Sequence, residues 1–174
     1  PRVRRQRQMC IETGETVTIT KFLGPVDPTN NGPYVITIPT TLDKYTVTGI
    51  GKWAFDRCGL HTLTIEGPIE SMGLAAFYEC TKLETISFGE NIETIGRWAF
   101  TGCSALTNVT IPKNVTTIES GTFKKCSKLE YIILPAGLTS FKDSLTGCPA
   151  GNPNGAIYYK TVSYTHLTLP TNSR

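Results

Sequence analysis

The chain has little histidine and no long apolar run, which argues against nucleophilic catalysis and against a membrane-spanning segment. Only 2 of its 174 residues are histidine, His61 and His166. Nucleophilic catalysis by Ser or Cys needs a base that is itself held in place, and His61, expected on a solvated strand surface, is a poor one. Neither a phosphate loop nor a dinucleotide fingerprint occurs, and no stretch of about 18 apolar residues could span a membrane. We therefore expect a non-enzymatic segment with no cofactor and no membrane span.

Positive charge is also scarce once the two ends are set aside. Residues 11–161 carry 12 basic and 14 acidic side chains, a net formal charge of −2, whereas the whole chain carries +3. The excess comes from four arginines in residues 1–10 and from Arg174. Because nucleic-acid binding needs a basic stripe on the folded body, we expect no nucleic-acid partner. The alternative is that residues 1–8 form a basic nucleic-acid-binding arm rather than a disordered or foreign terminus.

What the sequence has in abundance is a repeat. Its unit has the pattern I-x-x-I-G-x-x-A-F-x-x-C-x-x-L-x-x-I-x-I-P, with aliphatic substitutions. The phenylalanines recur at intervals of 22, 23 and 23 residues, and the cysteines at 22, 23, 23 and 22. These positions are Phe55, Phe77, Phe100 and Phe123, and Cys58, Cys80, Cys103, Cys126 and Cys148. A fixed period of this length indicates a solenoid, in which each repeat forms one turn, or coil.

The pattern also predicts the elements of one coil. Segments such as Leu106–Ile111 match the L-x-x-L-x-L strand of leucine-rich repeats, and pairs such as Val115 and Ile118 predict a second short strand. The Gly-x-x-Ala-Phe segment predicts a short helical turn. Because like residues of successive coils stack, we expect interior ladders of phenylalanine and of leucine. The leucine ladder contains Leu83, Leu106 and Leu129.

The cysteines do not have the spacing of a metal site. Zinc ligands come as Cys-x2–4-Cys or as Cys and His pairs, whereas here one cysteine occurs per coil. Stacking would place successive cysteine Cα atoms about 5 Å apart, but with parallel Cβ vectors that do not suit a disulfide. We therefore expect no metal and buried free thiols, while the state of Cys10, which lies outside the repeat, stays open.

The I-G-x-x-A-F-x-x-C-x-x-L spacing followed by an I-P turn resembles the BspA-like, or treponemal-type, leucine-rich repeat family, LRR_5-like, over about residues 45–148. The resemblance implies a mainly β, right-handed leucine-rich repeat solenoid of 22–23-residue repeats, with short helical turns and an N-terminal β cap. It also implies a cell-surface or secreted protein, because members are mostly bacterial and protozoal proteins of that kind. Several resemble adhesins for host proteins.

These patterns divide the chain into five parts. Residues 1–10 are expected to be a disordered tail, 11–50 an N-terminal β cap, 51–148 the array of four to five coils, and 149–161 a partial last coil. Residues 162–174 contain VSYTHLTLPT, which resembles a translated sequencing adaptor, so we interpret them as a non-native scar; a genuine edge strand is the alternative. Since the chain begins with Pro1 rather than Met, we expect it to be a piece of a longer protein.

The remaining candidate for function is the surface of the predicted strands. Side chains between the buried aliphatic positions should form outward-facing columns, and we predict that eight of them contact a partner. They are Thr62, Thr64, Thr85, Ser87, Asn108, Thr110, Tyr131 and Ile133. Tyr131 beside Ile133 is the expected anchor, because aromatic residues are frequent interface hot spots. The alternative is that a threonine-rich face reflects only β-propensity.

The sequence therefore predicts a monomeric, protein-binding module of a bacterial surface or secreted protein, adhesin-like, with a host extracellular protein as its partner. The alternative is an ancillary or spacer module of a larger protein whose activity lies outside these residues. Trp53 and Trp98 share the position two residues before a repeat phenylalanine. We expect both to pack over the convex side rather than to form a ligand cage.

Overall fold

The structure, a computed structural model of the chain, describes residues 9–13, 16–24, 33–42, 44–141, 144–148 and 158–161. Residues 1–8 of the predicted tail at 1–10 lie outside these residues, while Met9 and Cys10 are described as part of a strand. The predicted scar at 162–174 and most of the predicted partial coil also lie outside the described residues.

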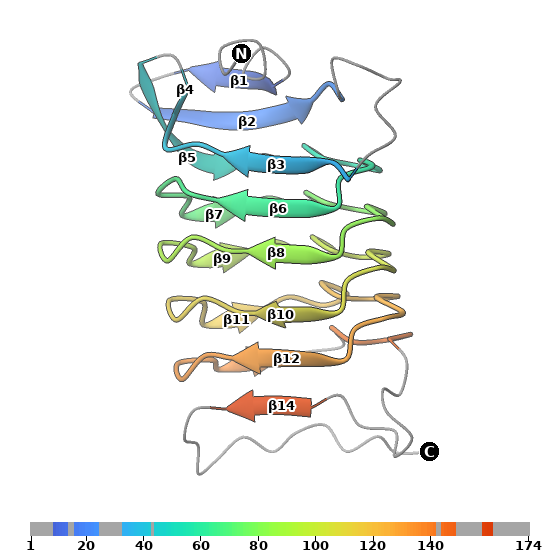
Figure 1. Ribbon diagram of the computed structural model, residues 1–174. Coiled ribbons are helices and arrows are strands. Elements are labelled where there is room, and N and C mark those ends of the chain that lie inside the picture. The colour runs from blue at the N-terminus through green and yellow to red at the C-terminus, as the bar shows by residue number, and fades with distance from the viewer. Residues whose placement is uncertain are drawn as a thin grey trace.

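The described residues form a solenoid with two columns of short strands (Figure 1). The front column contains β3 (Val35–Ile38), β6 (Thr62–Ile65), β8 (Thr85–Ser87), β10 (Asn108–Thr110), β12 (Tyr131–Leu134) and β14 (Tyr158–Thr161). The rear column contains β2 (Thr16–Phe22), β5 (Tyr45–Ile50), β7 (Ser71–Met72), β9 (Thr94–Ile95), β11 (Thr117–Ile118) and β13 (Ser140–Phe141). Strands that pair within a column run parallel. The predicted mainly β leucine-rich repeat solenoid is confirmed.

The N-terminal end differs from the array because two of its strand pairs are antiparallel. β1 (Met9–Thr13) pairs with β2, and β4 (Thr41–Leu42) pairs with β5. β1 therefore lies at the end of the eight-stranded rear sheet, where it pairs along the outer edge of β2. Covering an edge in this way satisfies backbone groups that would otherwise stay unpaired.

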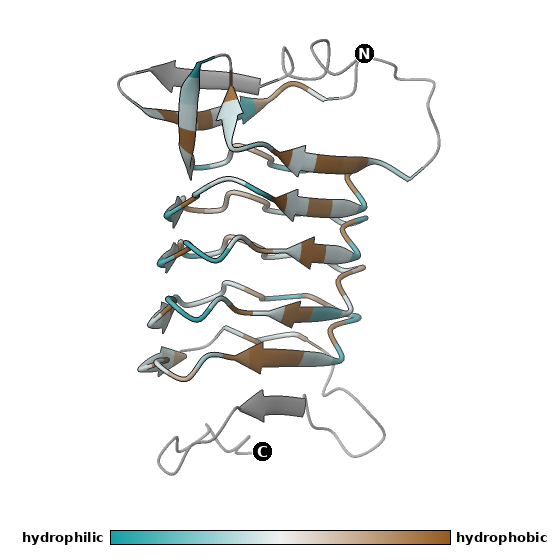
Figure 2. Cartoon of the chain, turned by 60° about the vertical axis from the view of Figure 1, so that its left-hand side comes forward, coloured by the Kyte–Doolittle hydropathy of each residue, from teal (hydrophilic) through white to brown (hydrophobic). Residues whose placement is uncertain are grey.

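Alternation of apolar and polar residues explains why these segments are strands. In β6 the side chains of Leu63 and Ile65 are buried, while those of Thr62 and Thr64 are half-buried on the outside. Figure 2 shows the same alternation of hydrophobic and hydrophilic residues along the front strands. A strand of period two buries one side only, so each coil directs its aliphatic residues inward.

The interior is built from ladders of like residues, as predicted. The rings of Phe55, Phe77, Phe100 and Phe123 are fully buried and stack face to face. Successive ring centroids lie 4.8, 5.3 and 5.6 Å apart, with interplanar angles of 12°, 6° and 5°. The side chains of Leu83, Leu106 and Leu129 are likewise buried. Like residues thus bury one another from coil to coil.

The short helical turns predicted around the phenylalanines are wrong, because the described residues form turns there and no helix. The residues two before and two after each phenylalanine adopt positive φ, as Trp98 (61°) and Gly102 (78°) do around Phe100. A right-handed helix cannot contain such residues. Their conformation turns alternate amides toward the next coil. The Phe77 amide donates to the Ala99 carbonyl at 2.8 Å and the Glu79 amide to the Thr101 carbonyl at 2.7 Å.

The five described cysteines are free thiols. Cys80, Cys103 and Cys126 are buried as predicted, whereas Cys58 and Cys148 are half-buried. Four of them donate to the carbonyl of the phenylalanine in the preceding coil. The Sγ to O distances are 3.0 Å for Cys80, 3.3 Å for Cys103, 3.2 Å for Cys126 and 2.9 Å for Cys148. Burial raises the pKa of the Cys103 thiol to about 12. The thiolate is the reactive form, so burial keeps the Cys103 thiol unreactive.

Candidate functional site

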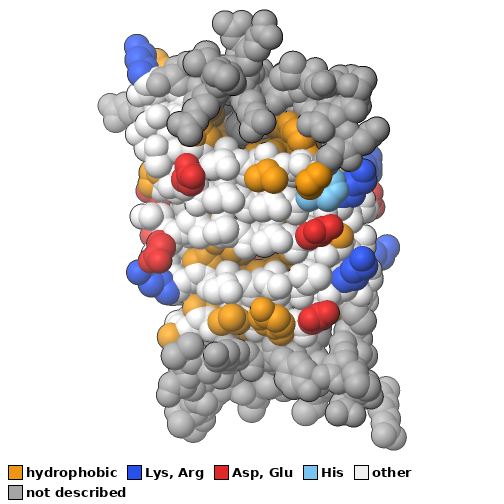
Figure 3. Space-filling model, viewed as in Figure 1, with side chains coloured by type: hydrophobic (Ala, Val, Ile, Leu, Met, Phe, Trp, Pro, Cys, Tyr) orange, Lys and Arg blue, Asp and Glu red, His pale blue; other side chains and the backbone are white. Residues whose placement is uncertain are grey.

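The eight predicted partner-contacting residues lie on one surface, the outward side of β6, β8, β10 and β12, which we call the sheet face. Thr62 pairs with Thr85 and Thr64 with Ser87 across β6 and β8. Asn108 pairs with Tyr131 and Thr110 with Ile133 across β10 and β12. Figure 3 shows this face as mainly polar, with hydrophobic side chains gathered toward its lower end, where β12 lies. Tyr131 is 39% exposed and Ile133 is half-buried.

The sheet face is divided, which the sequence analysis did not predict. β3, β6 and β8 form one sheet and β10, β12 and β14 another, and β8 does not pair with β10. The Thr107 amide lies 3.5 Å from the Glu84 carbonyl, whereas the equivalent bonds on either side are 2.8 Å (Glu84 to His61) and 2.7 Å (Glu130 to Thr107). The column of Thr62 and Thr85 therefore stops at this β8–β10 junction and resumes with Asn108.

Phe88 explains the division on the front. It occupies the repeat position of Ile65, Ile111 and Leu134, which are all buried, yet Phe88 is only half-buried. Its ring meets Phe100 edge-on, with centroids 5.8 Å apart and an interplanar angle of 79°. A ring at an isoleucine position needs more room than a close-packed interior provides, so the two coils stand apart.

The rear of the same coils shows a matching change at Glu119. The equivalent residues in earlier coils are glycines, and a Cβ built on Gly96 would lie 2.6 Å from the carbonyl carbon of Gly73. The Gly73 and Gly96 amides donate to the preceding coil at 2.7 and 2.8 Å, but in the described part of the chain the Glu119 amide makes no such bond. Where this position has a Cβ, as at Glu119, the hydrogen bond to the preceding coil is therefore absent among the residues that the structure describes.

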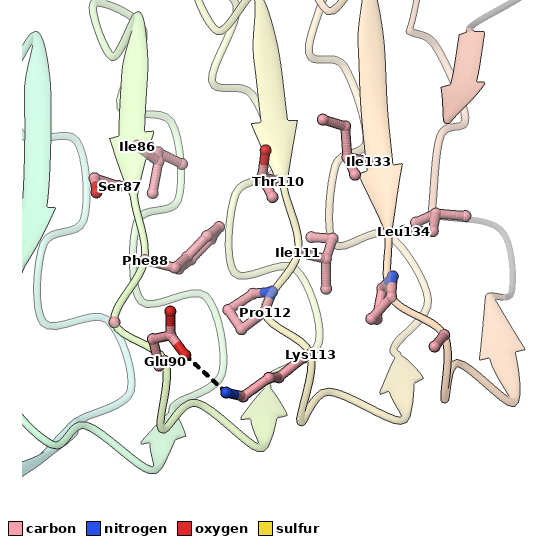
Figure 4. Close-up of a pocket in the computed structure, with 13 residues that line it drawn as sticks. Ile86, Ser87, Phe88, Glu90, Thr110, Ile111, Pro112, Lys113, Ile133 and Leu134 are labelled. Carbon is pink, nitrogen blue, oxygen red and sulfur yellow. Dashed lines mark hydrogen bonds and ion pairs between the residues drawn. The ribbon is translucent and has the colours of Figure 1, made fainter. Parts of the chain in front are cut away.

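A groove lies where the two sheets separate, with a volume of about 570 Å³. Phe88, Ile111, Ile133 and Leu134 are among its apolar lining residues, and the side chains of Ser87 and Thr110 also line it. Figure 3 shows hydrophobic side chains between the rows of β8 and β10. In Figure 4, Glu90 and Lys113 form an ion pair at one end of the groove, with a distance of 2.8 Å from Nζ to Oε2.

The groove adds residues that the sequence analysis missed. Phe88, Pro112 and Lys113 line it, and none was among the predicted contacts. The signal was present, because Phe88 breaks an aliphatic column and Gly89 stands where the next coil has Pro112. The strand β3 lies within the predicted N-terminal β cap at 11–50, but its place in the front column was not foreseen. It pairs Val35 with Thr62 and so extends the sheet face.

His61 has a more specific environment than the solvated strand surface predicted for it. Its Nδ1 accepts a hydrogen bond from the Tyr34 amide at 3.0 Å, and the side chain is half-buried. His61 itself lies just before β6 rather than in a strand, and it holds the segment that precedes β3. Within the described ranges, no group of three or more His, Cys, Asp or Glu residues could hold a metal ion. No helix there is long and apolar enough to cross a membrane.

Comparison with known proteins shows which family this sequence resembles. The profile of the BspA type leucine rich repeat region matches residues 36–148 in 6 copies. Repeats of this kind generally form non-enzymatic scaffolds for protein interaction. No curated protein matches the chain significantly.

Solved structures share the fold. A leucine rich cell surface protein from Faecalibacterium prausnitzii A2-165 matches 90% of the chain at 24% identity with a TM-score of 0.74. A leucine-rich repeat protein from Bacteroides ovatus ATCC 8483 matches 89% at 26% identity with a TM-score of 0.68. The chain covers 38% and 40% of these two proteins.

A shorter relative is covered more completely. A leucine-rich repeat protein from Bacteroides capillosus ATCC 29799 is 30% identical over 62% of this chain and 80% of its own length, with a TM-score of 0.54. The fold, the interior ladders and the profile match over residues 36–148 agree. The chain belongs to the BspA-type leucine-rich repeat family.

Proposed function

We propose that this solenoid is a non-enzymatic, protein-binding module of a bacterial cell-surface or secreted protein, with an adhesin-like role toward a host extracellular protein. The observation that carries the proposal is the groove at the β8–β10 junction, which places an apolar depression in the middle of a flat polar face. Binding energy in protein interfaces concentrates in a few side chains that fill such depressions. The polar residues around them exclude water and fix the orientation.

The exposed residues beside the groove suit this role. Tyr131 supplies a large ring that is 39% exposed, and Ile133 lies both on the sheet face and in the groove lining. Thr85 and Ser87 are exposed on the opposite side of the junction. A partner segment crossing from β8 to β12 would contact all eight predicted residues or their direct neighbours. The apolar floor beneath would then bind one of its hydrophobic side chains.

The test is a binding measurement on the complete chain with a panel of serum and extracellular-matrix proteins. We expect one of them to bind, and the double variant Tyr131→Ala with Thr85→Glu to weaken binding at least tenfold. A matched control, Leu74→Ala with Thr81→Glu, removes an exposed apolar side chain and adds one acid away from the sheet face. It should bind as the unchanged chain does.

Each failure has its own meaning. If a partner binds equally to both double variants, the sheet face is the wrong surface although the binding role is right. If no protein on the panel binds, the proposed role fails. In that case a spacer role is favoured, because two solved relatives are more than twice as long as the part that this chain covers.

A further inference from the structure

We propose that a second surface of this solenoid, the turns around the phenylalanines, binds a linear anionic polysaccharide. Each turn segment runs from the residue before its first positive-φ position to its second positive-φ residue. The four segments are 52–57, 74–79, 97–102 and 120–125, and together we call them the turn ridge. This surface lies on the turn side of each coil and shares no residue with the sheet face.

The turn ridge concentrates positive charge. It holds five basic and two acidic side chains, whereas the rest of residues 11–161 holds seven basic and twelve acidic ones. One of the two acids, Glu79, is already paired with Arg57 at 3.0 Å. Among the described residues, Lys52, Arg97, Lys124 and Lys125 are exposed and form no ion pair. A net acidic body with a basic ridge directs an anionic partner to that ridge.

Aromatic side chains lie among these cations. Trp53 is 41% exposed, and its ring centroid lies 5.2 Å from that of Tyr78 at an interplanar angle of 59°. The guanidinium carbon of Arg97 lies 4.5 Å from the centre of the Trp98 ring. An arginine stacked on an indole is held in place while its planar donor fork stays available to a sulfate or carboxylate.

The two tryptophans are not required by the turn itself. Both adopt positive φ, 58° at Trp53 and 61° at Trp98, which is unfavourable for a bulky residue. The equivalent residues of the other coils are Ala75 and Gly121. A Cβ on Gly121 would lie 2.3 Å from Trp98 Cδ1, so that glycine makes room for the indole. Strained residues that the fold could replace with smaller ones indicate a binding role.

The spacing of these groups favours a polysaccharide. Coils are spaced by 4.8 to 5.6 Å along the phenylalanine ladder, a step close to the length of one pyranose unit in a linear chain. Trp53 and Trp98 are two coils apart, or about 10 Å. The apolar C–H faces of pyranose rings stack on aromatic rings, and the intervening cations can then bind the acidic substituents. Nucleic acid is also bound by stacking and charge together, so the test must distinguish binding of a polysaccharide from binding of nucleic acid.

Heparin is the probe, titrated against the complete chain in about 0.15 M salt, where unspecific attraction is screened. We expect saturable binding that weakens at least tenfold in Arg97→Gln with Lys125→Gln, and about fivefold in Trp53→Ala, which changes no charge. Lys52→Gln with Lys124→Gln repeats the test at other positions. Thermal unfolding of each variant shows whether it is folded.

Two controls remove the same charge elsewhere, Lys44→Gln with Lys113→Gln on the body and Arg4→Gln with Arg5→Gln in the basic tail. Both should change heparin affinity less than threefold. The proposal is overturned if heparin does not bind, if a folded ridge variant binds no more weakly than the controls, or if only the tail variant loses affinity. It is also overturned if single-stranded DNA or polyglutamate binds the ridge as tightly as heparin.

Discussion

The coils before β8 and the junction after it use the same repeat but stack differently. From β6 to β8 three residue pairs are in register, and the Phe55 and Phe77 rings are 4.8 Å apart. From β8 to β10 no pair forms, and the Phe77 and Phe100 rings are 5.3 Å apart. At the rear, β7 and β9 share two pairs but β9 and β11 only one.

The difference shows which interactions hold this solenoid together. At the junction most of the front backbone pairing is lost, yet the Phe77 and Phe100 rings stay parallel within 6° and remain fully buried. Side-chain ladders therefore continue where the backbone ladder does not. Phe88 and Glu119 depart from the repeat at this junction, where the front strands separate and a groove opens while the core stays buried. A repeat protein can thus vary its surface within a constant interior.

The largest expected effect comes from breaking the ladder that both regions share. Phe100 stacks on Phe77 and Phe123 and also contacts Phe88. Phe100→Ala should lower the free energy of unfolding by about 3–5 kcal/mol, because a fully buried ring leaves a cavity. Urea denaturation followed by circular dichroism measures this. An unchanged transition midpoint would show that the ladder does not carry the core.

The next largest effect compares the same substitution at two equivalent positions, Gly96 in a closely stacked coil and Glu119 at the junction. Gly96→Ala places a Cβ 2.6 Å from the Gly73 carbonyl carbon, so we expect a loss of about 1–3 kcal/mol in unfolding free energy. Glu119→Ala, at the equivalent position of the junction, should change it by less than about 0.5 kcal/mol. The same denaturation experiment measures both. Equal effects at the two positions would contradict the role given to the glycines.

A smaller change in stability is expected when β8 and β10 are brought back together. Phe88→Ile restores the residue type found at positions 65 and 111. We expect a change in stability within about 1 kcal/mol, since the gained pairing offsets the lost ring contact with Phe100. Exchange of the Thr107 amide hydrogen, measured by NMR, should slow about tenfold as its bond to Glu84 shortens.

The reverse substitution is the matched control for that experiment. Ile111→Phe places a ring at the same repeat position between β10 and β12. It should speed exchange of the Glu130 amide, which now donates to Thr107 at 2.7 Å. If neither substitution alters amide exchange, the ring at position 88 is not the cause of the separation.

The smallest expected effect concerns the turns. Lys125 has a φ of 60°, whereas two other coils have a glycine at the equivalent position, Gly102 and Gly147. Lys125→Gly should raise the free energy of unfolding by about 0.5–1 kcal/mol, because the strain of a left-handed residue is relieved and only part of the gain is lost to unfolded-chain entropy. Thermal unfolding measures it, with the opposite substitution Gly102→Lys expected to destabilise. A destabilised Lys125→Gly would mean that the lysine stem packs on the ridge.

The parts of the fold that the sequence predicted are those that depend on repetition. The phenylalanine and leucine ladders, the strands and the free thiols all follow from like residues recurring every 22 or 23 positions. The turn conformation was predicted wrongly, since Gly-x-x-Ala-Phe suits a helical turn locally. The amides of that segment bond instead to the next coil, as the Phe77 amide does to Ala99. Such bonds exist only once coils are stacked.

The sequence by itself determined the architecture, because a period of 22–23 residues with fixed apolar positions has to bury those positions against copies of themselves. It also placed the eight predicted sheet-face residues on one side of the strands. Only the tertiary structure decided where that face divides, because the effect of Phe88 and Glu119 depends on the coils above and below them. The pairing of His61 with Tyr34 and the clustering of basic and aromatic residues on the turn ridge were likewise decided by contacts between residues more than 20 positions apart.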